Sequence, residues 1–151
     1  VGLVLPDELL KREVTTPGGG GDKVRYFPYR DLEAGIYSVL SERFAGVSKL
    51  SSAADGKIQS DGLTYLITPT ITTTSFSPSI VTWPPTVFTI EFACQISDAT
   101  NKPVTELRVQ GEGRAEFNEF KGDFSLAAKR AADEAMRKLL KALQEVSTRL
   151  N

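Results

Sequence analysis

The chain has 151 residues, of which 40% are hydrophobic and 25% charged, and its formal net charge is −1. This composition is typical of one globular domain that folds without disulfides or metals. The near-neutral charge argues against a nucleic-acid or anionic-membrane partner, since both require a basic surface. The absence of histidine excludes Ser-His-Asp and Cys-His catalysis and His-ligated zinc.

Three further features limit what the chain can do. Cys94 is the only cysteine, so an intramolecular disulfide and a thiolate metal cluster are excluded, and we expect no cofactor and no metal. No apolar stretch of about 18 residues occurs, so we expect no transmembrane segment. The chain begins at Val1 and not at Met, so the lack of a signal peptide indicates nothing about export.

Residues 1–28 carry short, mixed signals. Val1–Leu5 predicts a strand, Asp7–Arg12 a helical turn and Lys23–Phe27 a second strand. The Gly-rich stretch at 17–22 predicts a flexible loop. A phosphate loop is disfavoured because Lys23 is followed by Val24 and not by Ser or Thr, and no helix begins there.

The next segment predicts a helix over Asp31–Phe44, with apolar residues at helical spacing. Asp31 is the expected N-cap and Gly46 the expected stop. A short strand is expected at Val47–Leu50. Residues 51–62 are polar and rich in turn signals.

Long alternating runs predict strands over Leu63–Phe76, Val87–Asp98 and Val104–Phe117, the last two joined by a turn at residues 98–102. Pro69 cannot donate to a ladder, so its strand is at an edge or bulged there. In the last strand, Gly111 and Gly113 lie on the apolar face, which indicates either a closely approaching helix or a coiled strand.

A terminal helix is predicted over Ser125–Leu150, capped by Asp123 or Ser125, with favourable Glu134–Lys138 and Asp133–Arg137 spacings. Together these elements predict a single α+β domain over residues 1–151. We expect a mostly antiparallel sheet of four to five strands with two helices packed on one face.

The best candidate binding site is the proline-rich loop at residues 77–86. It places Phe76, Ile80, Val81 and Trp83 at the end of the sheet, and tryptophan is enriched at binding hot spots. The alternative is that Trp83 folds back and closes the end of the sheet. Partner-strand addition beside the outward threonines is a further alternative; these are Thr68, Thr70, Thr72 and Thr74.

Catalytic interpretations are weaker. Glu112, Glu116 and Glu119 are close in sequence, but Glu112 and Glu116 alternate with Arg114 on an exposed face, which favours solvated ion pairs. Cys94 lies among apolar residues and is expected in the core. A calcium site at Asp98 and Asn101 is disfavoured because the turn offers one carboxylate.

The order of elements resembles that of small Gram-negative envelope lipoproteins. A helix like Asp31–Phe44 is followed by the strand motif DGLTYLI at 61–67, the hairpin of Phe88–Asp98 and Val104–Phe117, and the motif DFSLAAKRA at 123–131 opening the last helix. YajG-like lipoproteins and lipoproteins with a fold like the TolB N-terminal domain are the most similar. The resemblance implies export to the periplasm, outer-membrane anchoring through a lipidated residue upstream of Val1, and a role in envelope assembly or transport. The lipobox cysteine of such proteins is absent here.

We therefore expect no enzyme, but a periplasm-facing domain that binds another protein or an envelope component, with homo-oligomerisation left open. One alternative is a small-ligand carrier with an apolar cavity between sheet and helices. The other is a histidine-free hydrolase that uses carboxylates such as Glu112 and Glu116, which requires acidic residues converging in a cleft.

Overall fold

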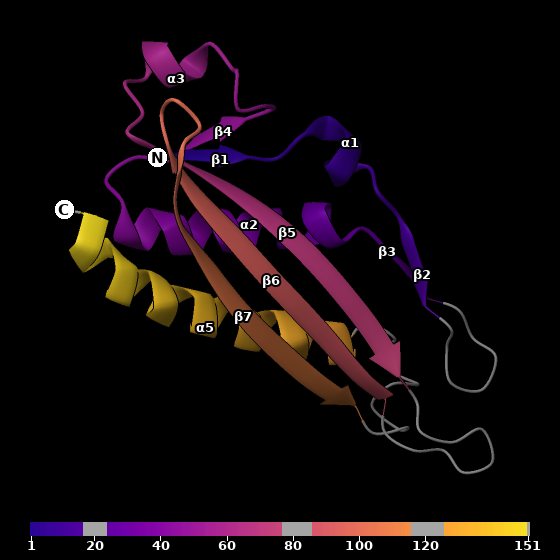
Figure 1. The fold of residues 1–151 in the computed structure, drawn as a ribbon. Coiled ribbons are helices and arrows are strands. Elements are labelled where there is room, and N and C mark those ends of the chain that lie inside the picture. Colours follow the sequence, from indigo (N-terminus) through magenta and orange to yellow (C-terminus); the bar gives the residue numbers. More distant parts are fainter. Residues whose placement is uncertain (17–23, 77–85, 116–125, 151) are drawn as a thin grey trace.

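The computed structural model describes residues 1–16, 24–76, 86–115 and 126–150, and Figure 1 shows their arrangement. The elements in chain order are β1 (Gly2–Val4), α1 (Asp7–Leu10), β2 (Val14–Thr16), β3 (Val24–Tyr26), α2 (Pro28–Arg43), β4 (Ser48–Leu50), α3 (Lys57–Ser60), β5 (Tyr65–Phe76), β6 (Thr86–Asp98), β7 (Pro103–Ala115) and α5 (Leu126–Leu150). The class is α+β, as predicted. No described helix is both long enough and apolar enough to cross a bilayer.

The main sheet has five strands in the order β4-β1-β5-β6-β7. The β5–β6 and β6–β7 pairs are antiparallel, but β1 pairs with both β4 and β5 in parallel. The predicted mostly antiparallel sheet is therefore corrected to a mixed one. The reason is that β1 comes from the N-terminus and inserts between two later strands, a long-range pairing that short apolar runs do not specify. A separate antiparallel pair joins β3 to β2, and β2 was not predicted.

The β6–β7 hairpin and its turn follow the prediction. Asp98 Oδ1 accepts hydrogen bonds from the hydroxyl and the backbone N–H of Thr100, at 2.6 and 2.9 Å, and from the backbone N–H of Lys102 at 3.0 Å. These donors, led by the Thr100 hydroxyl, lower the pKa of Asp98. Asn101 adopts a φ of 66°, a left-handed conformation that asparagine tolerates better than most residues.

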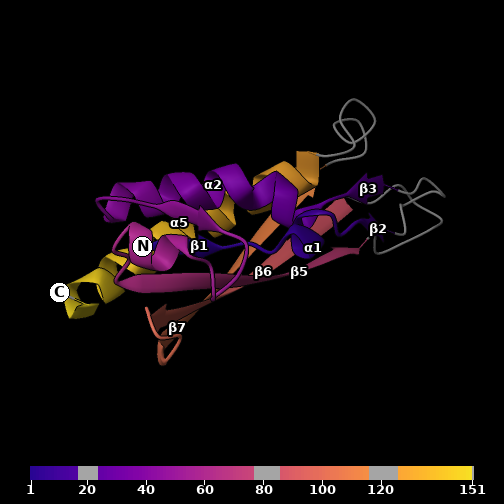
Figure 2. The ribbon, with the colours of Figure 1, turned by 90° about the horizontal axis from the view of Figure 1, so that it is seen from above.

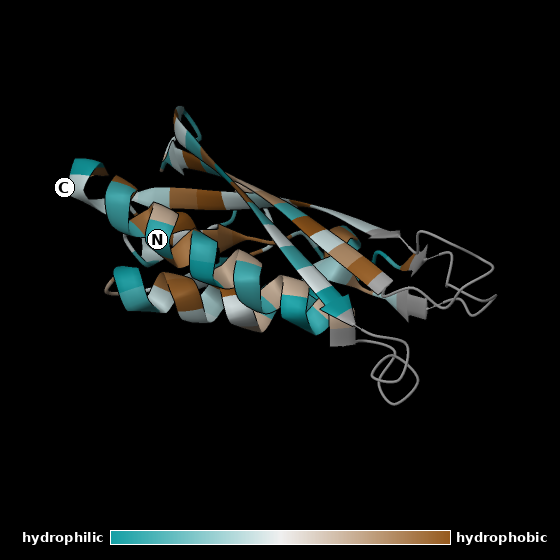
Figure 3. Ribbon diagram, turned by 90° about the horizontal axis from the view of Figure 1, so that it is seen from below, coloured by the Kyte–Doolittle hydropathy of each residue, from teal (hydrophilic) through white to brown (hydrophobic). Residues whose placement is uncertain are grey.

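The large core lies between the sheet and the two long helices. Helix α5 packs on β6 and β7, and α2 lies beside α5 over the same side of the sheet (Figure 2). Hydrophobic and hydrophilic residues alternate along the long strands (Figure 3), so one face of each strand contributes to the core. Phe92, Cys94 and Ile96 of β6 are almost fully buried.

Two glycines bring α5 onto β7. A Cβ on Gly111 would lie 2.2 Å from the Ala131 carbonyl oxygen, and one on Gly113 would lie 2.0 Å from that of Ala127. Of the two predicted interpretations, close approach of a helix is the correct one. Ala127 and Ala131 are buried at this contact.

Helix α5 also covers the outer edge of β7. The Arg130 guanidinium donates to the Arg114 carbonyl at 2.6 Å, and the Lys138 ammonium donates to the Gln110 carbonyl at 2.7 Å. Glu134 lies between Arg130 and Lys138 along α5. Its pKa is lowered by its Lys138 partner and also by a hydrogen bond from the backbone N–H of Glu112. One row of helix side chains thus satisfies backbone groups that a further strand would otherwise pair with.

A second, smaller core lies on the opposite face of the sheet at the β1 end. It contains Val4, Leu50, Ile58 and Leu66. Leu66 and its neighbour Ile67 are both fully buried because successive strand residues point to opposite faces. Helix α3, in a segment predicted to hold only turns, supplies Ile58 to this core.

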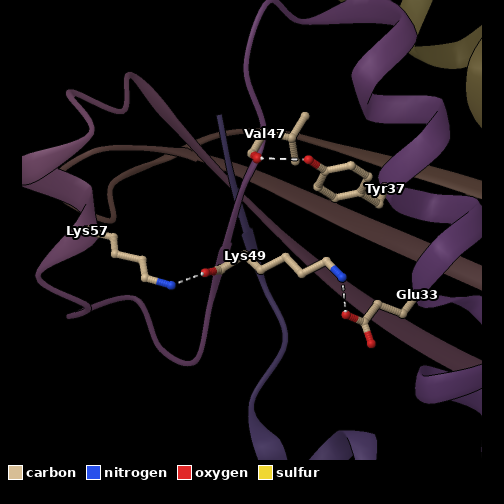
Figure 4. A network of polar contacts seen from close by, with 5 residues as sticks. All are labelled: Glu33, Tyr37, Val47, Lys49 and Lys57. Carbon is tan, nitrogen blue, oxygen red and sulfur yellow. Dashed lines mark hydrogen bonds and ion pairs between the residues drawn. The ribbon is translucent and has the colours of Figure 1, made fainter.

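A polar network attaches β4 to its neighbours (Figure 4). The Lys49 ammonium lies 2.8 Å from the Glu33 carboxylate of α2, and the Lys57 ammonium donates to the Lys49 carbonyl at 3.4 Å. The Tyr37 hydroxyl donates to the Val47 carbonyl at 3.4 Å. Such partly exposed contacts each add little stability, but together they fix the position of this edge strand.

Helix α2 begins three residues before the predicted start. Phe27 is its N-cap and Pro28 occupies the first turn, a position where a missing N–H carries no penalty. Asp31 is therefore not the N-cap. Its carboxylate accepts from the backbone N–H of Phe27 at 3.1 Å, so it still satisfies a donor at this helix end.

Candidate ligand-binding pocket

A pocket of about 360 Å³ opens between the sheet and the first turns of α2 and α5. The start of β6 and the first turns of α2 and α5, which contribute lining residues, lie away from the two labelled chain ends (Figure 1). Phe88 and Ile90 of β6 form its floor, and Leu32 of α2 and Ala132 of α5 form its walls. The remaining lining residues are Tyr26, Pro28, Asp31, Thr73, Ala128 and Lys129.

The space exists because α5 carries small residues at this level. Ala128 and Ala132 face the gap to α2, where larger side chains would fill it. One turn further along α5, the Met136 side chain lies 3.4 Å from the position that a Cβ on Gly35 of α2 would occupy. At that level Met136 occupies space between the two helices that the alanines leave open at the pocket.

Tyr26 forms part of one wall and makes two contacts there, a ring contact with Phe88 and a hydrogen bond to Thr73. The rings of Tyr26 and Phe88 meet edge to face, with centroids 5.3 Å apart and an interplanar angle of 69°. The Tyr26 hydroxyl hydrogen-bonds to the Thr73 hydroxyl. Burial raises the pKa of Tyr26, against a smaller lowering effect of Thr73, so the phenol is neutral at physiological pH.

Two charged side chains lie at the mouth. Asp31 Oδ1 is 3.7 Å from the Arg30 guanidinium, while Asp31 Oδ2 accepts from the Phe27 N–H. Lys129, in the first turn of α5, is exposed and takes part in an interaction of its own. The pocket thus combines an apolar interior with polar and charged groups at its opening, an arrangement typical of small-molecule sites.

The predicted loop site stays a prediction. Ile80, Val81 and Trp83 lie outside the described residues, and Phe76 is described only as the last residue of β5, where it pairs with Val87. The loop at 77–86 nevertheless joins the two strand ends that carry Thr73 and Phe88. The Gly-rich stretch and the proposed caps of α5 also lie outside the described residues.

The catalytic candidates do not converge in the described part of the chain. Glu112 is exposed and lies 3.0 Å from the Arg114 guanidinium, as the ion-pair interpretation requires, while Glu116 and Glu119 lie outside the described residues. Cys94 belongs to the core, as expected, and its burial raises the pKa of the thiol to about 12. The described residues contain no group of three or more acidic or cysteine side chains that could hold a metal.

The small-ligand carrier alternative predicted a cavity between the sheet and the helices, but the sequence did not identify the residues that line it. They come from β3, α2, β5, β6 and α5, so spacing along the chain cannot group them. The run of alanines at the start of α5 is the sequence feature that could have indicated the pocket. Small side chains leave an open space wherever the facing helix places no large side chain against them.

No protein-family model and no curated protein matches the sequence. Among solved structures, a minor lipoprotein from Acinetobacter baumannii superposes with a TM-score of 0.58 at 11% identity, covering 95% of this chain and 90% of that one. A protein from Caulobacter crescentus described as a lipoprotein gives 0.49 at 12% identity, covering 78% and 80%. A protein from Xanthomonas campestris gives 0.46 at 11% identity, covering 99% and 79%.

The chain thus has the fold of a small Gram-negative lipoprotein. The resemblance predicted from the order of its elements is confirmed at the level of fold. At this identity the similarity shows the fold alone.

Proposed function

We propose that this chain is the folded domain of a cell-envelope lipoprotein, facing the periplasm, which binds an apolar envelope component without catalysing a reaction. The observation that carries the proposal is the apolar pocket of about 360 Å³ between the sheet and the helices. This volume falls within the range of about 300–1,000 Å³ found for ligand sites. The fold shared with a minor lipoprotein supports the envelope location.

The groups around the pocket favour binding over chemistry. A glycosidase-type hydrolase needs two carboxyl groups, one with a raised pKa. Among the described lining residues, only Asp31 carries a carboxyl group, and it is engaged by Arg30 and by the Phe27 N–H. The Tyr26 hydroxyl is likewise committed to Thr73.

A lipid anchor attached upstream of Val1 is part of this proposal. Metabolic labelling of the full-length protein with radioactive palmitate in its native bacterium tests the anchor, and a protein that is neither labelled nor recovered with membranes would contradict it.

The pocket itself is tested with N-phenyl-1-naphthylamine, a neutral apolar dye that fluoresces on leaving water. We expect a saturable increase in fluorescence with the wild-type protein. Ala132→Phe fills the pocket from α5 and should weaken dye binding by at least tenfold. Ala142→Phe, about 15 Å further along the helix, is a matched control because Ala142 is also partly buried against the core.

Circular dichroism and thermal melts confirm that each variant is folded before titration. No saturable binding by the wild type, or equal binding by wild type and Ala132→Phe, would overturn the proposed function.

A further inference from the structure

We infer that the pocket takes a single-chain fatty acid, with its hydrocarbon chain between α2, α5 and β6 and its carboxylate at the mouth beside Lys129. The inference rests on the proposed function and specifies the ligand class. It follows from three properties of the site: its volume, the chemistry of its interior and the charge at its opening.

The volume fits one chain. A dry apolar cavity of about 150 Å³ is large enough to bind benzene, which has six carbons. On the same scale the pocket of about 360 Å³ accommodates roughly 14 carbon atoms. Two acyl chains of ordinary membrane lipids would need more than twice this space, so the volume argues against a diacyl lipid held inside.

The interior favours a flexible hydrocarbon. Its deep surface comes from Leu32, Phe88, Ile90 and the small residues Ala128 and Ala132. The hydroxyls of the Tyr26–Thr73 pair already bond to each other, so a ligand gains little by placing a polar group at this wall. Because an unpaired polar group in an apolar site is costly, the part of the ligand that enters should be hydrocarbon.

The opening favours a negative head group. Lys129 lines the pocket and is exposed, and its ammonium has three donors, so it can bind a carboxylate in addition to the interaction it already makes. It also lies in the first turn of α5, whose amide dipoles favour an anion. The opposing charge of Asp31 is offset by the Arg30 guanidinium 3.7 Å away.

Displacement of the dye by saturated fatty acids of 8 to 18 carbons, below their micelle concentrations, tests this inference. Each buried methylene should raise affinity by up to about fourfold, and the increase should level off near 14 carbons. Lys129→Ala should weaken binding of dodecanoate about three- to tenfold and leave dodecanol unchanged. Lys141→Ala, at an exposed position on the same helix, should affect neither ligand.

Other outcomes refute the inference. An affinity that does not depend on chain length excludes insertion of the chain. If Lys129→Ala weakens binding of dodecanol and dodecanoate equally, or of neither, the proposed head-group contact is excluded. Displacement by phosphatidylglycerol vesicles at lower lipid concentrations than by any fatty acid would identify a diacyl lipid instead. If the dye binds, Ala132→Phe abolishes its binding and no fatty acid displaces it, this inference fails while the proposed function stands.

Discussion

Adding one methyl group at Gly113 tests how tightly α5 is seated on the sheet. The new Cβ would lie 2.0 Å from the Ala127 carbonyl oxygen and 2.4 Å from the Ala131 nitrogen, whereas ordinary contacts begin at 3.4 Å. Both obstructing atoms belong to the helix backbone, so a rotamer change cannot relieve the clash. The helix must retreat by more than 1 Å, which loosens the buried contacts of Ala127 and Ala131.

Two effects of Gly113→Ala oppose each other. Overpacking destabilises by about 1–3 kcal/mol, with the upper end appropriate to an immovable backbone. Replacing glycine also restricts the unfolded chain, which stabilises by about 0.4–1 kcal/mol. The clash prevails, and we expect a net loss of about 2 kcal/mol in the free energy of unfolding. For a domain of this size the thermal midpoint falls by about 4–8 °C.

Thermal and urea unfolding followed by circular dichroism measure this loss, and the urea midpoint should fall by about 1 M. Gly46→Ala is the matched control, because a Cβ there has nothing within 4 Å and only the unfolded-state effect remains. If Gly113→Ala melts at or above the wild-type temperature, the close seating of α5 on β7 is wrong.

Three further predictions concern groups in and around the sheet. Tyr29→Phe removes the buried acceptor of the Ile71 N–H, which lies 3.1 Å from the hydroxyl, and should lower the free energy of unfolding in urea by about 1–3 kcal/mol. The control Tyr37→Phe, at a side chain that is 37% exposed, should change it by less than about 0.5 kcal/mol. Equal effects of the two variants would contradict the buried hydrogen bond of Tyr29. Because burial raises the pKa of Cys94 to about 12, a thiol-reactive disulfide reagent at pH 8 should modify it only after unfolding, and rapid labelling of the native protein would refute its place in the core. The pKa of Asp98 in the folded protein lies below its ordinary 3.8, so its stabilisation is present above that pH and lost as the pH falls through the folded value. Asp98→Ala should therefore lower the thermal midpoint at pH 7 and have progressively less effect as the pH falls below 3.8, and a constant difference would disprove this.

The sequence predicted the elements whose formation depends on residue spacing within one segment. Period-two alternation located β6 and β7, helical spacing located α5, and the glycines of β7 indicated the close approach of a helix. The prediction of a strand edge at Pro69 was also correct. This residue lies on β5 beyond the last residue paired with β1, where a missing N–H breaks no ladder.

The remainder depends on contacts between distant segments. The parallel insertion of β1 rests on three residues, Gly2–Val4, which are too few to specify a partner. Leu66 alternates along β5 with the outward threonine Thr68, yet it packs with Ile58 of α3 in the smaller core. The pocket is harder still, because it consists of space left by alanines among residues from five elements.

Methyl-resolved NMR of the labelled protein during a fatty-acid titration tests binding in the pocket most directly. We predict saturable shifts of the methyl signals of Leu32, Ile90 and Ala128, which line the pocket. The signals of Ile58 and Leu66, in the separate core on the opposite face, should stay unchanged. Shifts spread over both cores, or confined to residues outside the pocket, would contradict a ligand site between the sheet and the two long helices.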